Sequence, residues 1–274
     1  MRQLILQKNQ DKNGLVLVDG KDFHYLRQVL RVKVGDMVKL RLADGLPYDS
    51  TVCKIDDSAK KITLQVCAAL RQAQGVGRSA TFTSLQSKLA DNSYKIEFSL
   101  FQFIPKTQKL ELIVRQATEC GVKNIIPVIS EYAQKGNVDS LMGGKKDRLE
   151  RIIREARQQS GSPVETTVFE PVTVEQAVDL WNKMKEEAGG EKNAAGYVLS
   201  ERAVIRQVHQ PHESEVPEHV AIFCGNEGGI SPDELELLTK KALLQPVHFS
   251  VNILRCETAA LYGIAAIQTA IFGI

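Results

Sequence analysis

From about residue 94 onward, the sequence alternates between short apolar runs and longer segments with helical periodicity. This alternation limits the possible folds more than any other feature. KIEFSLFQFIP is predicted to be a strand, and an amphipathic helix is predicted over 107–121. Further strands are expected in NIIPVI, TTVFE, AAGYVLS, HVAIF and QPVHFSV, with helices ending near Ser160, over 173–187 and at the end of the chain. Strands that alternate with helices of this length predict an α/β layer with a mostly parallel sheet.

The first seventy or so residues have a different rhythm. Short β-runs such as LVLV, TVCKI and KKITLQV alternate with Asp-Gly and Gly-Asp turns, which is typical of a small barrel. One helix is expected to interrupt them over 22–32. Small polar residues dominate from about 72 to 93, as in a linker. We therefore predict a barrel domain over 1–74, a linker over 75–93 and an α/β domain over 94–274.

Charge is divided unevenly between these parts. Residues 1–78 contain fourteen Lys and Arg against eight Asp and Glu, or +6, whereas the rest contains 21 against 25, or −4. A basic module beside a mildly acidic scaffold is typical of a protein that faces nucleic acid. His24, Arg27, Arg31 and Lys33 form the candidate RNA contact, and a solvated cap on the predicted helix is an equally good interpretation of the same charges.

The chain's five cysteines are widely spaced and include no CxxC pair. This argues against a disulfide framework and against a metal site, and it suits a reducing cytosol. The N-terminus has no apolar run typical of a signal peptide. The apolar stretch over 259–274 is short for a membrane span and contains Gln268, so we expect a buried helix or a subunit interface. The expected location is cytoplasmic, with no membrane partner.

The stretch FCGNEGGISPDE directly follows the predicted strand HVAIF. In open α/β sheets, ligands bind at the carboxyl ends of strands, and glycines let the backbone approach a ligand closely. Ser231 and Glu234, with Pro232 at the first helical position, form a predicted capping box. The loop lacks the lysine of a phosphate-binding loop and the GxGxxG spacing, and it contains Glu227, so a phosphate ligand is disfavoured. A strand-to-helix connection without a ligand remains the alternative.

A second polar stretch, VHFSVNILRCETAA, follows soon after. We expect the strand VHFSV to run into Asn252, and Arg255, Glu257 and Thr258 to lie where the last helix begins. Polar groups in such an apolar setting are costly unless they are paired or contact a ligand. A structural ion pair between Arg255 and Glu257 explains the pattern as well as a binding site does.

FCGNEGGISPDE and NILRCETAAL together resemble the two C-terminal signatures of the RsmE family of SPOUT-class methyltransferases. HYLRQVLRVKVGD, KLELIVRQATECGVKNIIPV and REARQQSGSP are similar to further segments of that family. Members use S-adenosylmethionine (SAM) to methylate N3 of a uridine in small-subunit (16S) ribosomal RNA. The resemblance implies a PUA-like β-barrel, a SPOUT α/β domain with a deep trefoil knot, and a homodimer in which the partner subunit completes each site.

The same resemblance implies which residues act. Arg255 would stabilise the anion that develops on uracil, and Glu257 or Glu227 would orient it or accept the proton. The residues expected to hold SAM are Leu199, Ser200, Cys224, Gly225, Asn226, Gly228, Gly229, Ile230, Ser250, Val251, Asn252, Ile253, Leu254 and Thr258.

The chain departs from the family pattern at several of these positions. Asn226 stands where relatives usually have proline, and Ser250 and Asn252 also differ. GNEGG and SVNIL are similar to motifs of SPOUT enzymes that methylate a ribose 2′-hydroxyl. Two alternatives to uridine-N3 methylation follow, namely another RNA target such as the ribose, and an RNA-binding relic without catalysis.

Overall fold

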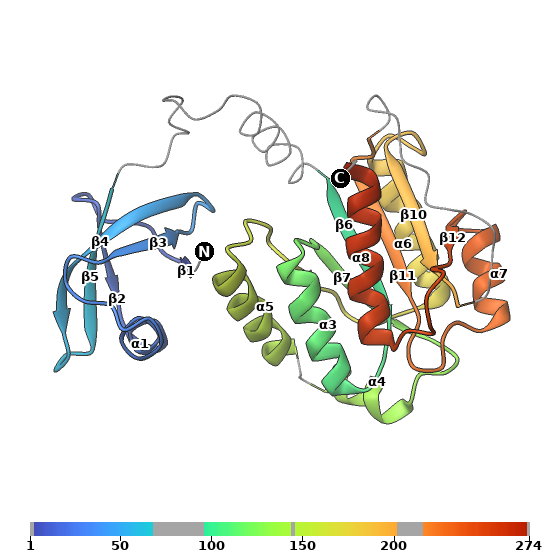
Figure 1. The fold of residues 1–274 in the computed structure, drawn as a ribbon, viewed down its shortest axis with the longest axis horizontal. Coiled ribbons are helices and arrows are strands. Elements are labelled where there is room, and N and C mark those ends of the chain that lie inside the picture. The colour runs from blue at the N-terminus through green and yellow to red at the C-terminus, as the bar shows by residue number, and fades with distance from the viewer. Residues whose placement is uncertain (1–2, 68–95, 144–145, 202–215, 273–274) are drawn as a thin grey trace. The chain divides into compact units, whose positions relative to one another are not determined.

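The computed structural model describes residues 3–67, 96–143, 146–201 and 216–272 (Figure 1). The chain divides into two compact units, which are described separately. The predicted linker over 75–93 falls within the residues outside this description. The boundaries proposed for it, and for the domains on either side, therefore stay predictions.

The N-terminal unit is a five-stranded sheet with the order β1-β3-β4-β5-β2. Its strands are β1 (Gln3–Ile5), β2 (Leu15–Val18), β3 (Met37–Arg41), β4 (Pro47–Asp56) and β5 (Lys61–Val66). The β1–β3 pair is parallel, and the other neighbouring pairs are antiparallel. Buried and more exposed side chains alternate along β5, which is how a strand covers a core with one face. The core of this unit includes Leu26, Leu40 and Leu64.

The helix expected over 22–32 is only partly correct. The structure has a short α1 (Gly20–His24) that continues as one π-helical turn, η1 (Tyr25–Val29). The wider turn lets the Leu30 N–H donate to the Tyr25 carbonyl, and Arg31 then takes a positive φ of 54° that ends the helix. Apolar periodicity predicted a helix but not its early end.

The C-terminal unit is built on a parallel sheet with the order β12-β10-β11-β6-β7-β8, and β9 also pairs with β7. The strands are β6 (Glu97–Phe103), β7 (Asn124–Ile129), β8 (Thr167–Val168), β9 (Val172–Thr173), β10 (Ala194–Leu199), β11 (His219–Cys224) and β12 (Gln245–Val247). All the pairings in it are parallel. The predicted α/β layer with a parallel sheet is confirmed.

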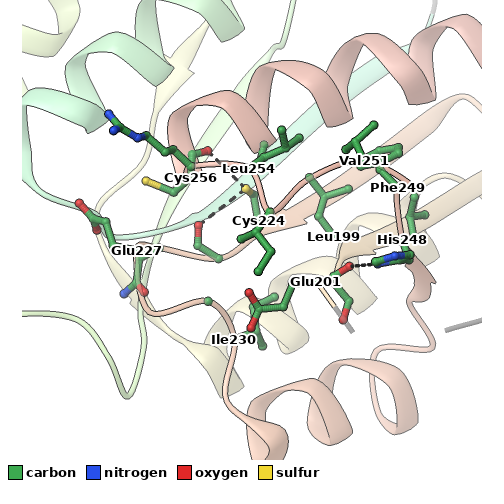
Figure 2. A pocket seen from close by; sticks show the side chains of 18 of the residues that line it. Leu199, Glu201, Cys224, Glu227, Ile230, His248, Phe249, Val251, Leu254 and Cys256 are labelled. Atoms are coloured by element: carbon green, nitrogen blue, oxygen red, sulfur yellow. Dashed lines mark hydrogen bonds between the residues drawn. The ribbon is translucent and has the colours of Figure 1, made fainter. Parts of the chain in front are cut away.

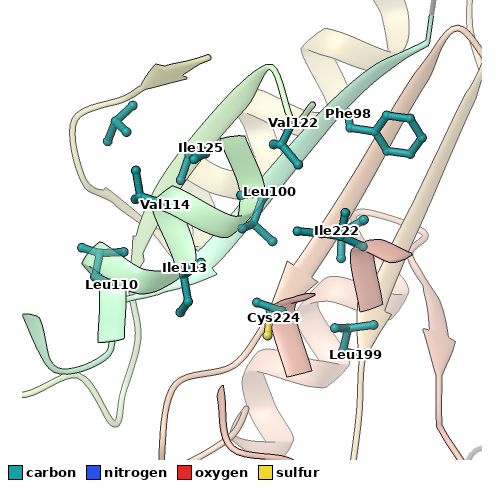
Figure 3. Packing of buried hydrophobic residues seen from close by; sticks show 14 of the residues in the cluster. Phe98, Leu100, Leu110, Ile113, Val114, Val122, Ile125, Leu199, Ile222 and Cys224 are labelled. Atoms are coloured by element: carbon teal, nitrogen blue, oxygen red, sulfur yellow. The ribbon is translucent and has the colours of Figure 1, made fainter. Parts of the chain in front are cut away.

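Helices cover both faces of this sheet (Figure 1). α3 (Thr107–Glu119), α5 (Lys146–Ser160) and α8 (Cys256–Phe272) pack on one face, and α6 (Val174–Glu187) and α7 (Pro232–Lys240) pack on the other. A further helix, α4 (Lys135–Met142), was not predicted. Figure 3 shows the first core, where Leu100 and Ile222 of the sheet lie beside Ile113 and Val114 of α3. Successive side chains of β6 point to opposite faces of the sheet. Phe98 therefore belongs to one core, and Phe101 belongs to the other.

The last strand is shorter than predicted, which has consequences for the site. The sequence predicts a strand through Val251, but β12 ends at Val247. β12 is an edge strand that pairs with β10 alone, and Pro246 has no N–H to donate. Residues 248–255 therefore leave the sheet, and the chain moves from the α7 face to the α8 face across the strand ends.

The trefoil knot depends on the course of residues 202–215, which lie outside the described residues, so it stays a prediction. Within the described ranges, no helix combines the length and apolar character needed to cross a bilayer. The final helix, expected over the apolar stretch 259–274, is α8, and its buried side chains join the core.

Candidate active site

Three chain segments meet at the carboxyl ends of β10, β11 and β12 and enclose a cavity of about 350 Å³ (Figure 2). The segments are the end of β10 with Glu201, the glycine loop after β11, and residues 248–255 after β12. In Figure 2, Glu227 and Cys256 lie toward one end of the cavity, and His248 and Phe249 lie toward the other. This is the edge of the sheet at which α/β proteins bind ligands.

Most of the predicted SAM-binding residues line this cavity. They are Leu199, Ser200, Cys224, Gly225, Asn226, Gly229, Ile230, Val251, Asn252, Ile253 and Leu254, together with the predicted catalytic residues Arg255 and Glu227. Gly228, Ser250, Glu257 and Thr258 are not among the lining residues. The structure thus brings together the two predicted motifs, and it leaves four of the predicted residues beside the cavity rather than on its wall.

Several lining residues were missed by sequence reasoning. They are Lys109, Glu201, Leu235, Val247, His248, Phe249, Cys256 and Ala259. His248 and Phe249 were assigned to a strand, and Cys256 and Ala259 lie beside motif residues. Their neighbours in the sequence therefore offered a signal for these four. Lys109 is remote from both motifs, and no local pattern indicated it.

The glycine loop is closed by the side chain of Asn226. Its Oδ1 accepts a hydrogen bond from the Gly228 N–H (2.9 Å), and its Nδ2 donates to Ser130 Oγ (3.0 Å) and, at 3.4 Å, to the Ile104 carbonyl. Asn226 is only 6% exposed. Where the resemblance led us to expect a proline with its fixed φ, Asn226 therefore holds the loop through side-chain hydrogen bonds.

Two glycines are required by how this loop packs on itself. A Cβ at position 225 would lie 2.8 Å from the Gly229 carbonyl carbon, and Gly229 has φ of +79°. The loop then enters α7 through the predicted capping box, in which Ser231 and Glu234 exchange hydrogen bonds. Glu234 Oε1 also accepts from the Glu131 N–H (2.8 Å), so the cap ties α7 to the segment after β7.

A charged cluster stands at the Glu227 end of the cavity. Lys109 Nζ of α3 lies 3.4 Å from Glu227 Oε1 and 3.2 Å from Glu257 Oε2. It also lies 3.9 Å from Cys256 Sγ, and that thiol donates to Glu257 Oε2 at 3.3 Å. Helix α3, the glycine loop and the start of α8 are therefore joined by one cation.

Ionisation in this cluster follows from these contacts. Burial acts to raise the pKa of Glu257, but hydrogen bonds from its own backbone N–H, Lys109 and Cys256 outweigh it and lower the pKa. Burial likewise acts to lower the pKa of Lys109, and Glu257, Cys256 and Glu227 raise it overall. Burial, reinforced by the carboxylates, raises the pKa of Cys256 to about 12. The cluster thus contains an ammonium, an ionised Glu257 and a neutral thiol at neutral pH.

The ion pair between Arg255 and Glu257, one of two interpretations of this stretch, is not found among the described residues. Glu257 pairs with Lys109, while Arg255 is exposed at the cavity wall without an ion pair in the described part of the chain. Arg255 precedes α8, and Glu257 lies in its first turn.

In the N-terminal unit, the predicted RNA-binding residues differ in their contacts. Arg27 donates to Asp57 from Nε and Nη2, both at 2.9 Å, and to the Val32 carbonyl from Nη1 at 3.1 Å. It therefore holds the segment after η1 in place. His24, Arg31 and Lys33 are exposed. The RNA contact stays a prediction that now depends on these three residues.

The cavity fits SAM by size and by lining. Small-molecule sites typically enclose about 300–1,000 Å³ and combine apolar walls with a few polar groups. Leu199, Ile230 and Leu254 supply apolar wall, and Glu201 and Glu227 supply carboxylates suited to a positively charged ligand. Within the described residues, no group of three or more His, Cys, Asp or Glu is placed to hold a metal ion.

The fold and the cavity define an α/β protein with a ligand site at the strand ends, joined to a small β unit. The chain belongs to the RNA methyltransferase family: the model of its RNA methyltransferase domain matches residues 92–268, and that of the RNA methyltransferase PUA domain matches 18–67. The resemblance seen in the sequence is confirmed.

Similar proteins agree with this assignment. Ribosomal RNA small subunit methyltransferase E of Rickettsia conorii is 27% identical over 94% of this chain and 91% of its own length. A protein of the same name, numbered 2, from Borreliella burgdorferi is 25% identical over 97% of this chain and 96% of its own. The crystal structure of the Neisseria gonorrhoeae enzyme bound to S-adenosyl methionine has a TM-score of 0.70 and 21% identity, over 98% of this chain and 97% of that one. The last comparison supports the fold.

Proposed function

We propose that this protein transfers a methyl group from SAM to N3 of a uridine in small-subunit (16S) ribosomal RNA. One observation carries the proposal: residues of FCGNEGGISPDE and of NILRCETAAL line the same cavity. The chain that forms this cavity belongs to the RNA methyltransferase family. The printed names of its relatives specify the small-subunit ribosomal RNA. The departures at Asn226 and Asn252 leave the cavity intact, which disfavours a relic without catalysis.

SAM is proposed to lie along this cavity, held by the ends of β10 and β11 and by residues 251–254. When bound, it supplies a methyl group on a positively charged sulfur, and the carbon–sulfur bond breaks with its electron pair on sulfur. Holding the uracil in line with that methyl supplies much of the rate. Arg255, exposed on the wall and unpaired among the described residues, would stabilise the anion that develops on uracil.

RNA is proposed to contact the N-terminal unit through His24, Arg31 and Lys33. Cations that neutralise phosphates release counterions, so binding should weaken steeply as salt rises. The protein is further proposed to act in the cytoplasm as a homodimer whose partner subunit completes each site. Tyr262 on α8 is 43% exposed and could contribute to that interface. Light scattering of the purified chain gives the oligomeric state.

The test is methyl transfer from labelled SAM to isolated small ribosomal subunits, followed by nucleoside analysis. Label in N3-methyluridine is expected. Label in a 2′-O-methyl nucleoside would redirect the activity to the ribose, and no SAM binding by calorimetry would refute an enzyme. Arg255→Ala should lose about 100-fold in rate, as when a group that stabilises developing charge is removed. The matched control Arg151→Ala, exposed on α5, should retain activity.

A further inference from the structure

Lys109 is a half-buried cation at the cavity that sequence reasoning did not connect to the site. Its side chain is 27% exposed and lies between carboxylates from two other segments, Glu227 at 3.4 Å and Glu257 at 3.2 Å. A flexible lysine loses rotamer freedom when it is held in this way, so two partners at once indicate a defined position. The question is what that position does for the cavity.

The two carboxylates are placed differently. Glu227 lines the cavity and its side chain is 31% exposed. One oxygen, Oε1, forms the ion pair with Lys109 and accepts a hydrogen bond from the Lys106 backbone N–H (3.2 Å). Within the described residues, Oε2 of Glu227 has no hydrogen-bond partner. Glu257 is 15% exposed, does not line the cavity, and accepts from both Lys109 and Cys256. Glu227 thus lies on the cavity wall with one oxygen that no other described group bonds, whereas Glu257 does not line the cavity.

The groups that surround Lys109 come from each neighbouring element. Glu227 belongs to the glycine loop, Glu257 and Cys256 belong to α8, and Arg255 precedes α8 on the cavity wall. Lys106 begins α3, and its backbone N–H rather than its exposed ammonium contacts Glu227. Without Lys109, two carboxylates would remain near each other, with their closest cation removed. Repulsion between like charges at this range would then move the two carboxylates apart.

We infer that Lys109 is a positioning residue for methyl transfer: it holds the Glu227 carboxylate at the cavity wall, and Glu257 anchors Lys109. In the step that this serves, the uracil N3–H bond breaks, its electron pair stays on N3, and the proton forms an O–H bond with Glu227 Oε2. This inference rests on the proposed function, because the uridine N3–H supplies the proton that the acceptor takes. The geometry thereby divides the roles of the two candidate carboxylates, with Glu227 as acceptor and Glu257 as support.

The test compares Lys109→Met, Lys109→Arg and Glu227→Gln with wild type in kcat and KM for ribosomal RNA and, by calorimetry, in SAM affinity. Lys109→Met should lower kcat about 10-fold, because the acceptor is no longer held in place, and should leave SAM affinity close to that of wild type. Lys109→Arg should restore kcat, and Lys135→Met, exposed on α4, should leave it unchanged.

A structural role alone would lower SAM affinity and stability together with kcat. A Lys109→Met variant that keeps the wild-type kcat, or that loses kcat only in proportion to SAM affinity, would overturn the inference. So would a further loss of kcat on adding Lys109→Met to Glu227→Gln, since the lysine is argued to act through that glutamate. If Lys109→Met does not fold, the kcat of Lys109→Gln decides in the same way. Wild-type protein that binds SAM but methylates no uridine N3 refutes the proposed function itself, and that outcome is distinct from a Lys109→Met variant with wild-type kcat.

Discussion

The Asn226 side chain offers the most direct test of how the glycine loop is held. Asn226→Ala removes two well-formed hydrogen bonds, from the Gly228 N–H at 2.9 Å and to Ser130 Oγ at 3.0 Å, and a weak one at 3.4 Å. A typical hydrogen bond contributes about 0.5–1.5 kcal/mol net, and a buried partner left unpaired costs more. Because Asn226 is 6% exposed, we expect the free energy of unfolding to fall by about 2–3 kcal/mol.

Urea unfolding measures this directly, and the melting temperature should fall by about 4–12 °C at about 2–4 °C per kcal/mol. Calorimetric SAM titration should also show weaker binding, because the loop must then be ordered at the expense of binding energy. The control is Asn137→Ala on α4, whose side chain makes an exposed 3.4 Å contact with Gln134. The control should stay within about 0.5 kcal/mol of wild type. If Asn226→Ala is as stable as that control, the hydrogen bonds of the Asn226 side chain do not stabilise the loop.

Three further predictions concern other parts of the cavity. Gly263→Ala would place a Cβ 2.4 Å from Leu199 Cδ1. We expect the free energy of unfolding in urea to fall by about 1–3 kcal/mol and SAM binding to weaken. Unchanged SAM affinity would show that Leu199 moves freely. Cys256, with its pKa raised to about 12, should be alkylated more slowly near neutral pH than the exposed Cys53, as followed by mass spectrometry, and equal rates would contradict this. The pKa of Glu257 lies below its ordinary value of 4.5, so its stabilisation is present above that value and is lost as pH falls through the folded-state pKa. The stability difference between wild type and Glu257→Gln should therefore vanish in acid, and a difference that persists there would refute the ion pair.

Features encoded by neighbouring residues were predictable from the sequence. Periodicity predicted α3 and the parallel strands, and the Ser231-Pro232-Asp233-Glu234 spacing predicted a capping box that the structure contains. Local patterns failed where tertiary contacts decide. An edge position and Pro246 end β12 early, and one π-helical turn shortens the helix after Gly20. Lys109 joins partners 118 and 148 positions away along the chain, and no window of sequence contains them both.

The glycine loop shows how a correct prediction can have a different physical reason. The glycines were expected because a ligand approaches the backbone closely. The structure shows that the protein's own packing already requires Gly225, where a Cβ would meet the Gly229 carbonyl, and Gly228, where it would lie 2.8 Å from Tyr132 Cβ. With Asn226 hydrogen-bonded across the loop and Ser231 capping α7, the conformation is set without a ligand. A site formed in advance loses little conformational entropy when it binds, so its affinity depends mainly on the contacts that line the cavity.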